Sequence, residues 1–112
     1  MVKPWCWQIS ARYDVTMGTT EHTDAEDADA AFARALGAEL VAARRMKKLS
    51  QEEAAREAGI SKRSLIRFEY GDPSLKLKVL RSIAAALGVE TSDLLLAAQE
   101  RATREAAYGS LN

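Results

Sequence analysis

The chain has too few of several residue types for the chemistry that they carry. One cysteine, Cys6, and one histidine, His22, exclude a disulfide framework, a zinc finger and most metal-ligand clusters. The six glycines lie at least twelve positions apart, and this spacing excludes a glycine-rich phosphate loop. Apolar runs are far shorter than the roughly 20 residues that span a bilayer, and the first residues lack a signal-peptide pattern. We therefore expect no metal, no cofactor, no membrane segment and a cytoplasmic location.

Charge of one sign is also not in excess, but the two signs are unevenly distributed. Residues 1–32 hold two basic and six acidic residues, whereas residues 33–112 hold fourteen basic and ten acidic ones. A basic body is compatible with a polyanionic partner, although ordinary solvated helices reach the same imbalance. The 112 residues, 47% of them hydrophobic, are sufficient for one compact domain with an arm or a tail.

Residues 5–16 are the one segment that alternates as a β-strand does. Trp5, Trp7, Ile9, Tyr13 and Val15 recur on one face of this segment. Because a lone strand is unstable in water, we expect it to pair with the same strand of a second subunit or to lie on the helical body. A loosely ordered terminal arm is the alternative. Residues 1–22 are assigned to this N-terminal arm.

The remaining sequence has the spacing and the capping residues of five helices. Capping boxes begin at Thr23 and Ser50, Ser61 and Thr91 are further N-caps, and Gly59 ends a short helix. The predicted helices cover about residues 23–48, 51–58, 62–69, 75–87 and 91–108. The inward side of the fourth helix is predicted to hold five apolar residues: Leu77, Leu80, Ile83, Ala84 and Leu87. Residues 23–96 then form one all-α domain, and residues 97–112 form a C-terminal helical extension.

Residues 49–71 contain two short capped helices joined by a tight turn. Ala55 is small where two crossing helices touch, Gly59 permits a positive φ, and Ile60 fills the angle between the helices. A helix-turn-helix requires these three choices.

On these residues the sequence resembles the XRE/Cro-type helix-turn-helix family of bacterial and phage DNA-binding regulators. The resemblance covers about residues 36–96 and includes Leu49-Ser50-Gln51, Gly59-Ile60-Ser61 and Ala86-Leu87-Gly88-Val89. It implies a five-helix domain that docks its third helix, residues 62–69, into the DNA major groove, usually as a two-fold dimer.

The resemblance also implies one structural ion pair and marks three departures from the family pattern, the first being Val41 in place of a common basic residue. Arg44 and Glu69 match the residues that form a buried pair in the family. Ala54 stands where a larger aliphatic residue is preferred, which predicts loose packing of the second helix. Asp72 places a negative charge in a loop that often approaches phosphate.

A helical wheel divides residues 62–69 into a buried side, which holds Leu65 and Phe68, and an exposed side. The exposed side spans about 140° and holds Lys62, Arg63, Ile66 and Arg67. A merely solvated basic face would leave Ile66 in water among cations, with no acid nearby on the helix. Arginines paired with guanine and an aliphatic contact with a thymine methyl explain all four residues together.

Further DNA contacts are expected beside this face. The resemblance places Gln51, the first residue of the second helix, over a backbone phosphate, although a capped helix alone also explains it. Lys76 and Lys78 either reach the flanking backbone or are solvated. The predicted DNA-binding residues are Gln51, Ser61, Lys62, Arg63, Ser64, Ile66, Arg67, Lys76 and Lys78.

One recognition helix covers only a few base pairs, so we expect a homodimer on a two-fold symmetric operator. The candidate dimer elements are the strand 5–16 and the helix 97–108. One side of the last helix holds Leu95, Ala98, Ala102 and Ala106. Because alanine seams are weak, the strand is the favoured element.

The sequence thus predicts a sequence-specific DNA-binding transcriptional regulator, most simply a repressor, associated with the nucleoid when bound. The alternative is an antitoxin or another protein-interaction module of the same fold, which the acidic stretch 21–29 would favour through a protein partner. An enzyme is not expected, because His22 lies in a polar linker without a nearby acid and nucleophile.

Overall fold

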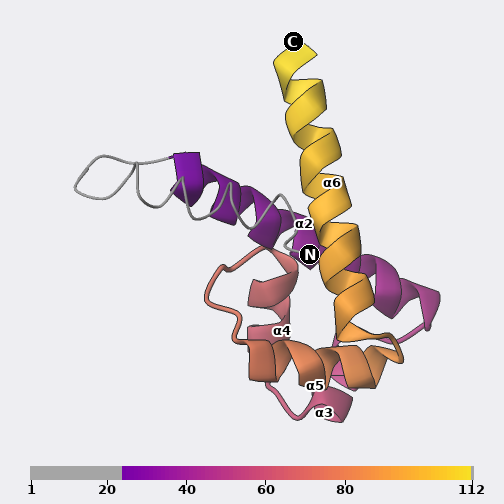
Figure 1. The fold of residues 1–112 in the computed structure, drawn as a ribbon. Coiled ribbons are helices and arrows are strands. Elements are labelled where there is room, and N and C mark those ends of the chain that lie inside the picture. The colour runs from indigo at the N-terminus through magenta and orange to yellow at the C-terminus, as the bar shows by residue number, and fades with distance from the viewer. Residues whose placement is uncertain (1–23, 112) are drawn as a thin grey trace, which may run out of the picture.

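The computed structural model describes residues 24–111, which form five α-helices (Figure 1). The helices are α2 (Asp24–Met46), α3 (Gln51–Ala58), α4 (Lys62–Glu69), α5 (Leu77–Leu87) and α6 (Thr91–Leu111). No residue in this range belongs to a strand, and the all-α, five-helix prediction is confirmed for it. The predicted strand 5–16 and the Thr23 cap lie outside the described residues.

The two long helices, α2 and α6, pack against each other, and the three short helices gather at one end of this pair (Figure 1). Helix α4 packs on both α2 and α3, while α5 packs on α3 and α6. The last turns of α6 extend beyond the other helices (Figure 1). The short helices therefore form the compact end of the molecule, and α4 lies within that end.

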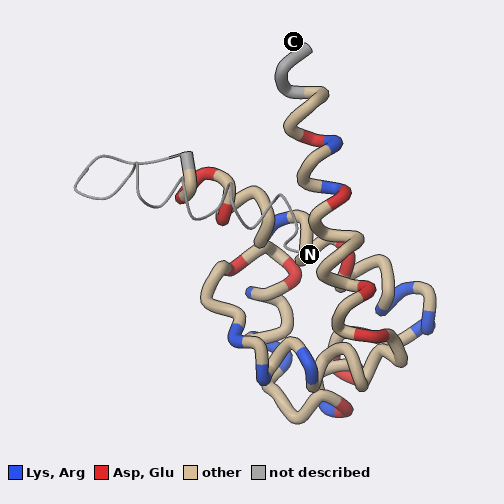
Figure 2. The backbone as a smooth tube through the Cα atoms, viewed as in Figure 1, with Lys and Arg blue, Asp and Glu red and all other residues tan. Residues whose placement is uncertain are grey.

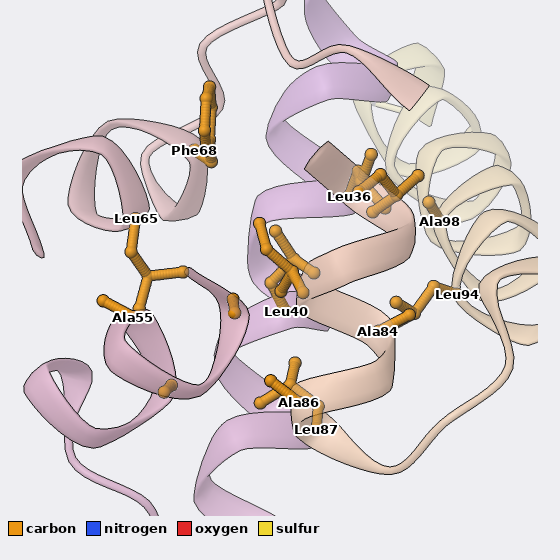
Figure 3. Close-up of a cluster of buried hydrophobic side chains, with 14 of the residues drawn as sticks. Leu36, Leu40, Ala55, Leu65, Phe68, Ala84, Ala86, Leu87, Leu94 and Ala98 are labelled. Carbon is orange, nitrogen blue, oxygen red and sulfur yellow. The ribbon is translucent and has the colours of Figure 1, made fainter. Parts of the chain in front are cut away.

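One apolar core joins all five helices (Figure 3). Its fully buried large side chains are Leu40 of α2, Leu65 of α4 and Ile83 of α5. Ala54 is only 1% exposed, and Ala55 is 2% exposed. Both alanines therefore belong to the buried core, and the loose packing predicted at Ala54 stays a prediction.

The short helices begin and end where their capping residues predict. Ser50 Oγ accepts the Glu53 N–H at 3.0 Å, and Glu53 Oε1 accepts the Ser50 N–H at 2.9 Å, which completes the capping box of α3. Gly59 follows α3 with φ 74°, in the left-handed region that glycine adopts without strain. Ser61 Oγ accepts the Ser64 N–H at 3.0 Å and caps α4. These local bonds fix the turn between α3 and α4.

Gly37 determines how closely α4 approaches α2. A Cβ atom at residue 37 would lie 2.5 Å from the Glu69 carbonyl oxygen and 2.8 Å from that of Phe68. Such distances are shorter than van der Waals contact, so the carboxyl end of α4 can lie here only against a residue without a side chain. The C-terminal end of α4 therefore packs directly against the backbone of α2 at Gly37.

Three details of the later helices differ from the sequence prediction. Helix α5 begins at Leu77 and not at Leu75, and Leu77, predicted to face inward, is 63% exposed. Helix α6 continues past the predicted end at Tyr108 to Leu111. The first turn of α5 lies at the edge of the core, where no described element covers Leu77.

The side of α6 that was a candidate dimer seam is used largely within the chain. Ala98 is completely buried, and Leu95 and Ala102 pack partly against the core. Arg101 Nε also donates to Glu39 Oε2 of α2 at 2.6 Å, across the contact between the two long helices. This seam is therefore an internal contact of α6, and of the four predicted residues only Ala106 is exposed.

Candidate nucleic-acid interface

Helix α4 presents one apolar and one basic side, because its eight residues are held by two buried anchors. Leu65 is 1% exposed and Phe68 is 7% exposed, and both belong to the core. The other side carries the exposed side chains of three cations and the half-buried side chain of Ile66. The cations are Lys62, Arg63 and Arg67. All four residues therefore lie on the predicted side of α4, and Ile66 is less exposed than the three cations.

Basic residues gather around this helix. Figure 2 shows Lys and Arg on α4 and around the start of α5, at the end of the molecule away from the C-terminus. Lys76, which precedes α5, and Lys78, in its first turn, are both exposed. The structure thus places these two lysines in the element that follows α4, and their side chains are accessible to solvent.

Glu69, the last residue of α4, joins three helices. Arg44 Nε of α2 donates to Glu69 Oε2 at 2.7 Å, and the two side chains are 12% and 5% exposed. Gln51 Nε2 of α3 donates to Glu69 Oε1 at 2.9 Å. A second guanidinium nitrogen of Arg44 donates to the Leu49 carbonyl at 2.9 Å. We call Arg44, Gln51 and Glu69 the Glu69 junction; it fixes the end of α4 relative to α2 and α3.

The junction adds a structural role for Gln51 that the sequence did not indicate. Gln51 Nε2 donates one of its two hydrogens to Glu69, so the second hydrogen and the backbone N–H groups at the start of α3 remain as donors. Residues 51 and 69 are eighteen positions apart, and no local spacing rule relates them. Only the packing of α3 on α4 brings them together.

Arg67 is held by the loop that follows its own helix. Its Nε lies 3.3 Å from Asp72 Oδ2, and its Cζ lies 5.3 Å from the centroid of the Phe68 ring. Asp72 Oδ1 accepts the Ser74 N–H at 2.9 Å, and the Asp72 N–H donates to the Arg67 carbonyl at 3.2 Å. The bond from the Ser74 N–H, more than the nearby Arg67 charge, lowers the pKa of Asp72. Asp72 is therefore an ionised partner of Arg67, and both its side chain and its backbone N–H are hydrogen-bonded.

Lys62 and Arg63 differ in how they are held. Lys62 Nζ lies 3.1 Å from Glu52 Oε1 of α3, in a pair whose side chains are 49% and 70% exposed. Within residues 24–111, Arg63 has no ion-pair partner. The prediction noted no acid near these cations on the helix, and the acids beside Lys62 and Arg67 come from other elements. Sequence reasoning missed them because each pair depends on how a turn folds back.

Ser61 and Ser64 form the start of α4. Besides capping, the Ser61 hydroxyl donates to Ser64 Oγ at 2.9 Å. Ser61 is exposed and Ser64 is half-buried. This leaves the first turn of α4 well ordered, with its backbone N–H groups at the surface beside Lys62.

The described residues offer neither a metal site nor a membrane segment. No group of three or more His, Cys, Asp or Glu side chains within them could hold a metal ion. No helix among them is both long and apolar enough to cross a bilayer. Among the described residues, the basic side of α4 is therefore the candidate binding site.

Comparison with known proteins agrees with this geometry. A helix-turn-helix family model matches residues 40–94. The crystal structure of the clp gene regulator ClgR from Corynebacterium glutamicum is similar to the chain at 30% identity and a TM-score of 0.68, over 71% of this chain and 85% of that one. The restriction-modification controller protein C.AhdI from Aeromonas hydrophila is similar at 29% identity and a TM-score of 0.54, over 55% and 94%. No curated protein sequence matches the chain.

The fold and the basic helix define a helix-turn-helix DNA-binding protein. The chain belongs to the XRE-type helix-turn-helix family, and the predicted family resemblance is confirmed. As a member of this family it is a DNA-binding transcriptional regulator.

Proposed function

We propose that the protein binds a two-fold symmetric operator as a homodimer, with α4 in the major groove, and represses transcription by blocking promoter access. The observation that carries this proposal is the basic side of α4, where three exposed cations flank the half-buried Ile66 above two buried anchors. Arg63 and Arg67 pair with guanines, and Ile66 contacts a thymine methyl group. Lys62 and Ser61 contact the backbone where α4 enters the groove.

The remaining predicted residues fix the position of the domain on the duplex. The N-terminal N–H groups of α3, beginning at Gln51, bind one phosphate, and the Ser64 hydroxyl supports the same end of α4. Lys76 and Lys78 bind the flanking backbone. These contacts carry no sequence information, so they add affinity to all DNA.

Selection of bound sites from a random oligonucleotide pool tests the proposal directly, because it gives the sequence and the half-site spacing together. We expect a palindrome with half-sites about one helical turn apart. Arg63→Ala and Arg67→Ala are each expected to cost about 1–3 kcal/mol of discrimination between operator and random DNA, while the fold is retained. Arg104→Ala, an exposed position on α6, is the matched control.

Two results would contradict the proposal. A wild-type protein that selects no sequence while co-purifying with a second protein would favour the protein-interaction role. Arginine variants that retain full discrimination would show that α4 is not the reading element.

The homodimer has its own test. Removal of residues 1–16, followed by mass measurement with light scattering, is expected to yield a monomer, because the predicted strand is the favoured dimer element. A truncated protein that remains dimeric would rule out the strand as the interface.

A further inference from the structure

Two of the three cations on α4 are paired with acids, and the two pairs differ in rigidity. The Lys62–Glu52 pair joins two long, exposed side chains, and Glu52 has no other bond among the described residues. The Arg67–Asp72 pair uses a short side chain that is 28% exposed and is held at a second point. The first pair is readily exchanged for a phosphate, whereas the second is built into the loop.

The two oxygens of Asp72 divide their work. Oδ1 accepts the Ser74 N–H, which fixes the carboxylate to the backbone of its own turn. Oδ2 is left to face Arg67 Nε at 3.3 Å. The Asp72 N–H also donates to the Arg67 carbonyl, so the backbones of the two residues are joined. The position of Oδ2 relative to the end of α4 is therefore set by main-chain bonds.

Arg67 is constrained on two sides as a result. Asp72 Oδ2 forms an ion pair with its Nε at 3.3 Å, and the Phe68 ring centroid lies 5.3 Å from its guanidinium carbon. Phe68 is itself a buried anchor of α4. Because the carboxylate lies beside Nε, the two terminal guanidinium nitrogens remain as donors, and a pair of donors in one plane is what the O6 and N7 atoms of guanine require.

We propose that Asp72 is a positioning residue for DNA recognition: it orients Arg67 before binding, so that Arg67 reads guanine through its terminal nitrogens. This inference rests on the proposed function. It adds a role for Asp72 to the expectation from sequence, which noted only a negative charge in a loop that often approaches phosphate. Asp72 reduces the affinity for all DNA by its charge, and it raises the preference for one base pair by holding Arg67 in place.

The test is Asp72→Asn, with Glu52→Gln as the matched control. The asparagine retains an oxygen for the Ser74 N–H but turns an NH₂ group toward Arg67. Glu52→Gln removes the same charge from beside Lys62. Affinities are measured for the selected operator, for random DNA, and for operators changed at the base pair whose preference is lost in Arg67→Ala.

We expect Asp72→Asn to lower discrimination at that base pair about three- to tenfold, and to leave the other positions unchanged. Glu52→Gln is expected to raise the affinity for every DNA alike, without a change in discrimination. In the Arg67→Ala background, Asp72→Asn is expected to have no further effect on discrimination, since the two residues act as one unit.

The result that overturns the inference is equal discrimination by wild type and Asp72→Asn, or the same loss with Arg67 absent. An Arg67→Ala variant that alters no base preference also overturns it. The two Asp72→Asn results leave the proposed function standing, because the wild-type protein still selects an operator. The Arg67→Ala result also removes Arg67 from the base-reading residues of the proposed function. A wild-type protein without any sequence preference refutes the proposed function itself, and the inference falls with it.

Discussion

Glu69 accepts hydrogen bonds from two helices that precede it in the chain, and it is almost completely buried. A buried carboxylate of this kind is costly to desolvate and is stable only with its full set of donors. Arg44 supplies the charge that compensates it, and Gln51 supplies one neutral donor. The two partners are thus unequal, and their removal is expected to have unequal effects.

Removal of the Arg44 side chain is expected to destabilise the protein more than removal of the Gln51 side chain. Arg44→Ala leaves the Glu69 charge buried, so it is expected to lower the free energy of unfolding by about 3–5 kcal/mol. Gln51→Ala removes one neutral hydrogen bond and is expected to cost about 1 kcal/mol. Urea denaturation measures both. Equal costs for the two variants would show that charge compensation is not what the junction provides.

Two carboxylates with lowered pKa values make the stability of the fold sensitive to acid. The pKa of Glu53 is lowered by its bond from the Ser50 N–H, and that of Asp72 by its bond from the Ser74 N–H. A lowered folded-state pKa adds stability above the unfolded-state value of about 4, and this stability is lost as the pH falls through the lower folded value. Melting temperatures are therefore expected to fall as the pH drops below about 4.

The variant that checks this acid dependence is Glu53→Gln, which retains an acceptor for the Ser50 N–H. The melting-temperature difference between wild type and Glu53→Gln is expected to be largest near neutral pH and to shrink in acid. A difference that stays constant across the titration would contradict the assignment to Glu53.

At the scale of helices, the close packing of α4 against α2 depends on Gly37. Gly37→Ala places a Cβ within 2.5 Å of the Glu69 carbonyl oxygen, which belongs to backbone and cannot rotate away. Helix α4 is expected to shift, at a cost of about 1–3 kcal/mol, and operator affinity is expected to fall with it. Calorimetry and DNA titration measure the two effects.

Gly59→Ala is the comparison for this variant. A Cβ there meets nothing within 4 Å, but the residue keeps φ 74°, which costs an L-residue about 1–2 kcal/mol. We therefore expect lost stability with little change in operator affinity, measured at a temperature where both variants are folded. Similar affinity losses in both variants would show that Gly37 does not set the position of α4.

The elements themselves were largely predictable from sequence, because their signals are local. The capping box at Ser50 and the positive φ at Gly59 each follow from residues within one or two turns. Leu77 was placed inward by periodicity alone, and periodicity does not say whether anything covers the first turn of a helix. Ala98 belongs to an apolar side of α6 whose spacing predicts a contact surface. The spacing cannot distinguish a contact within the chain from one between chains.

The candidate site was predicted only in outline for a related reason. A helical wheel identifies the basic side of α4, since it needs the sequence of one helix. The pairs of Arg67 with Asp72 and of Gln51 with Glu69 depend on how a loop turns back and how two helices pack. Neither pair has a spacing rule, so the sequence offered no signal for the partners.

On the scale of the whole molecule, the uneven charge predicts the salt dependence of DNA binding. Lys76 and Lys78 are exposed beside α4 and are proposed to bind phosphates. Each lysine-to-alanine change is expected to reduce the slope of log K against log salt by about 1, with equal effects on operator and random DNA. Filter binding over a range of salt concentrations measures the slope. An unchanged slope would show that the lysine is merely solvated.

The Glu69 junction has a kinetic consequence for the complete protein. Because α2, α3 and α4 are tied together at one carboxylate, we expect the free chain to keep this arrangement of helices when it binds DNA. An encounter then succeeds without a conformational search, and the association rate is governed by diffusion, by charge steering and by how often the two surfaces meet face to face. If the protein recognises an operator as proposed, we expect differences in residence time, rather than in association rate, to separate that operator from other DNA.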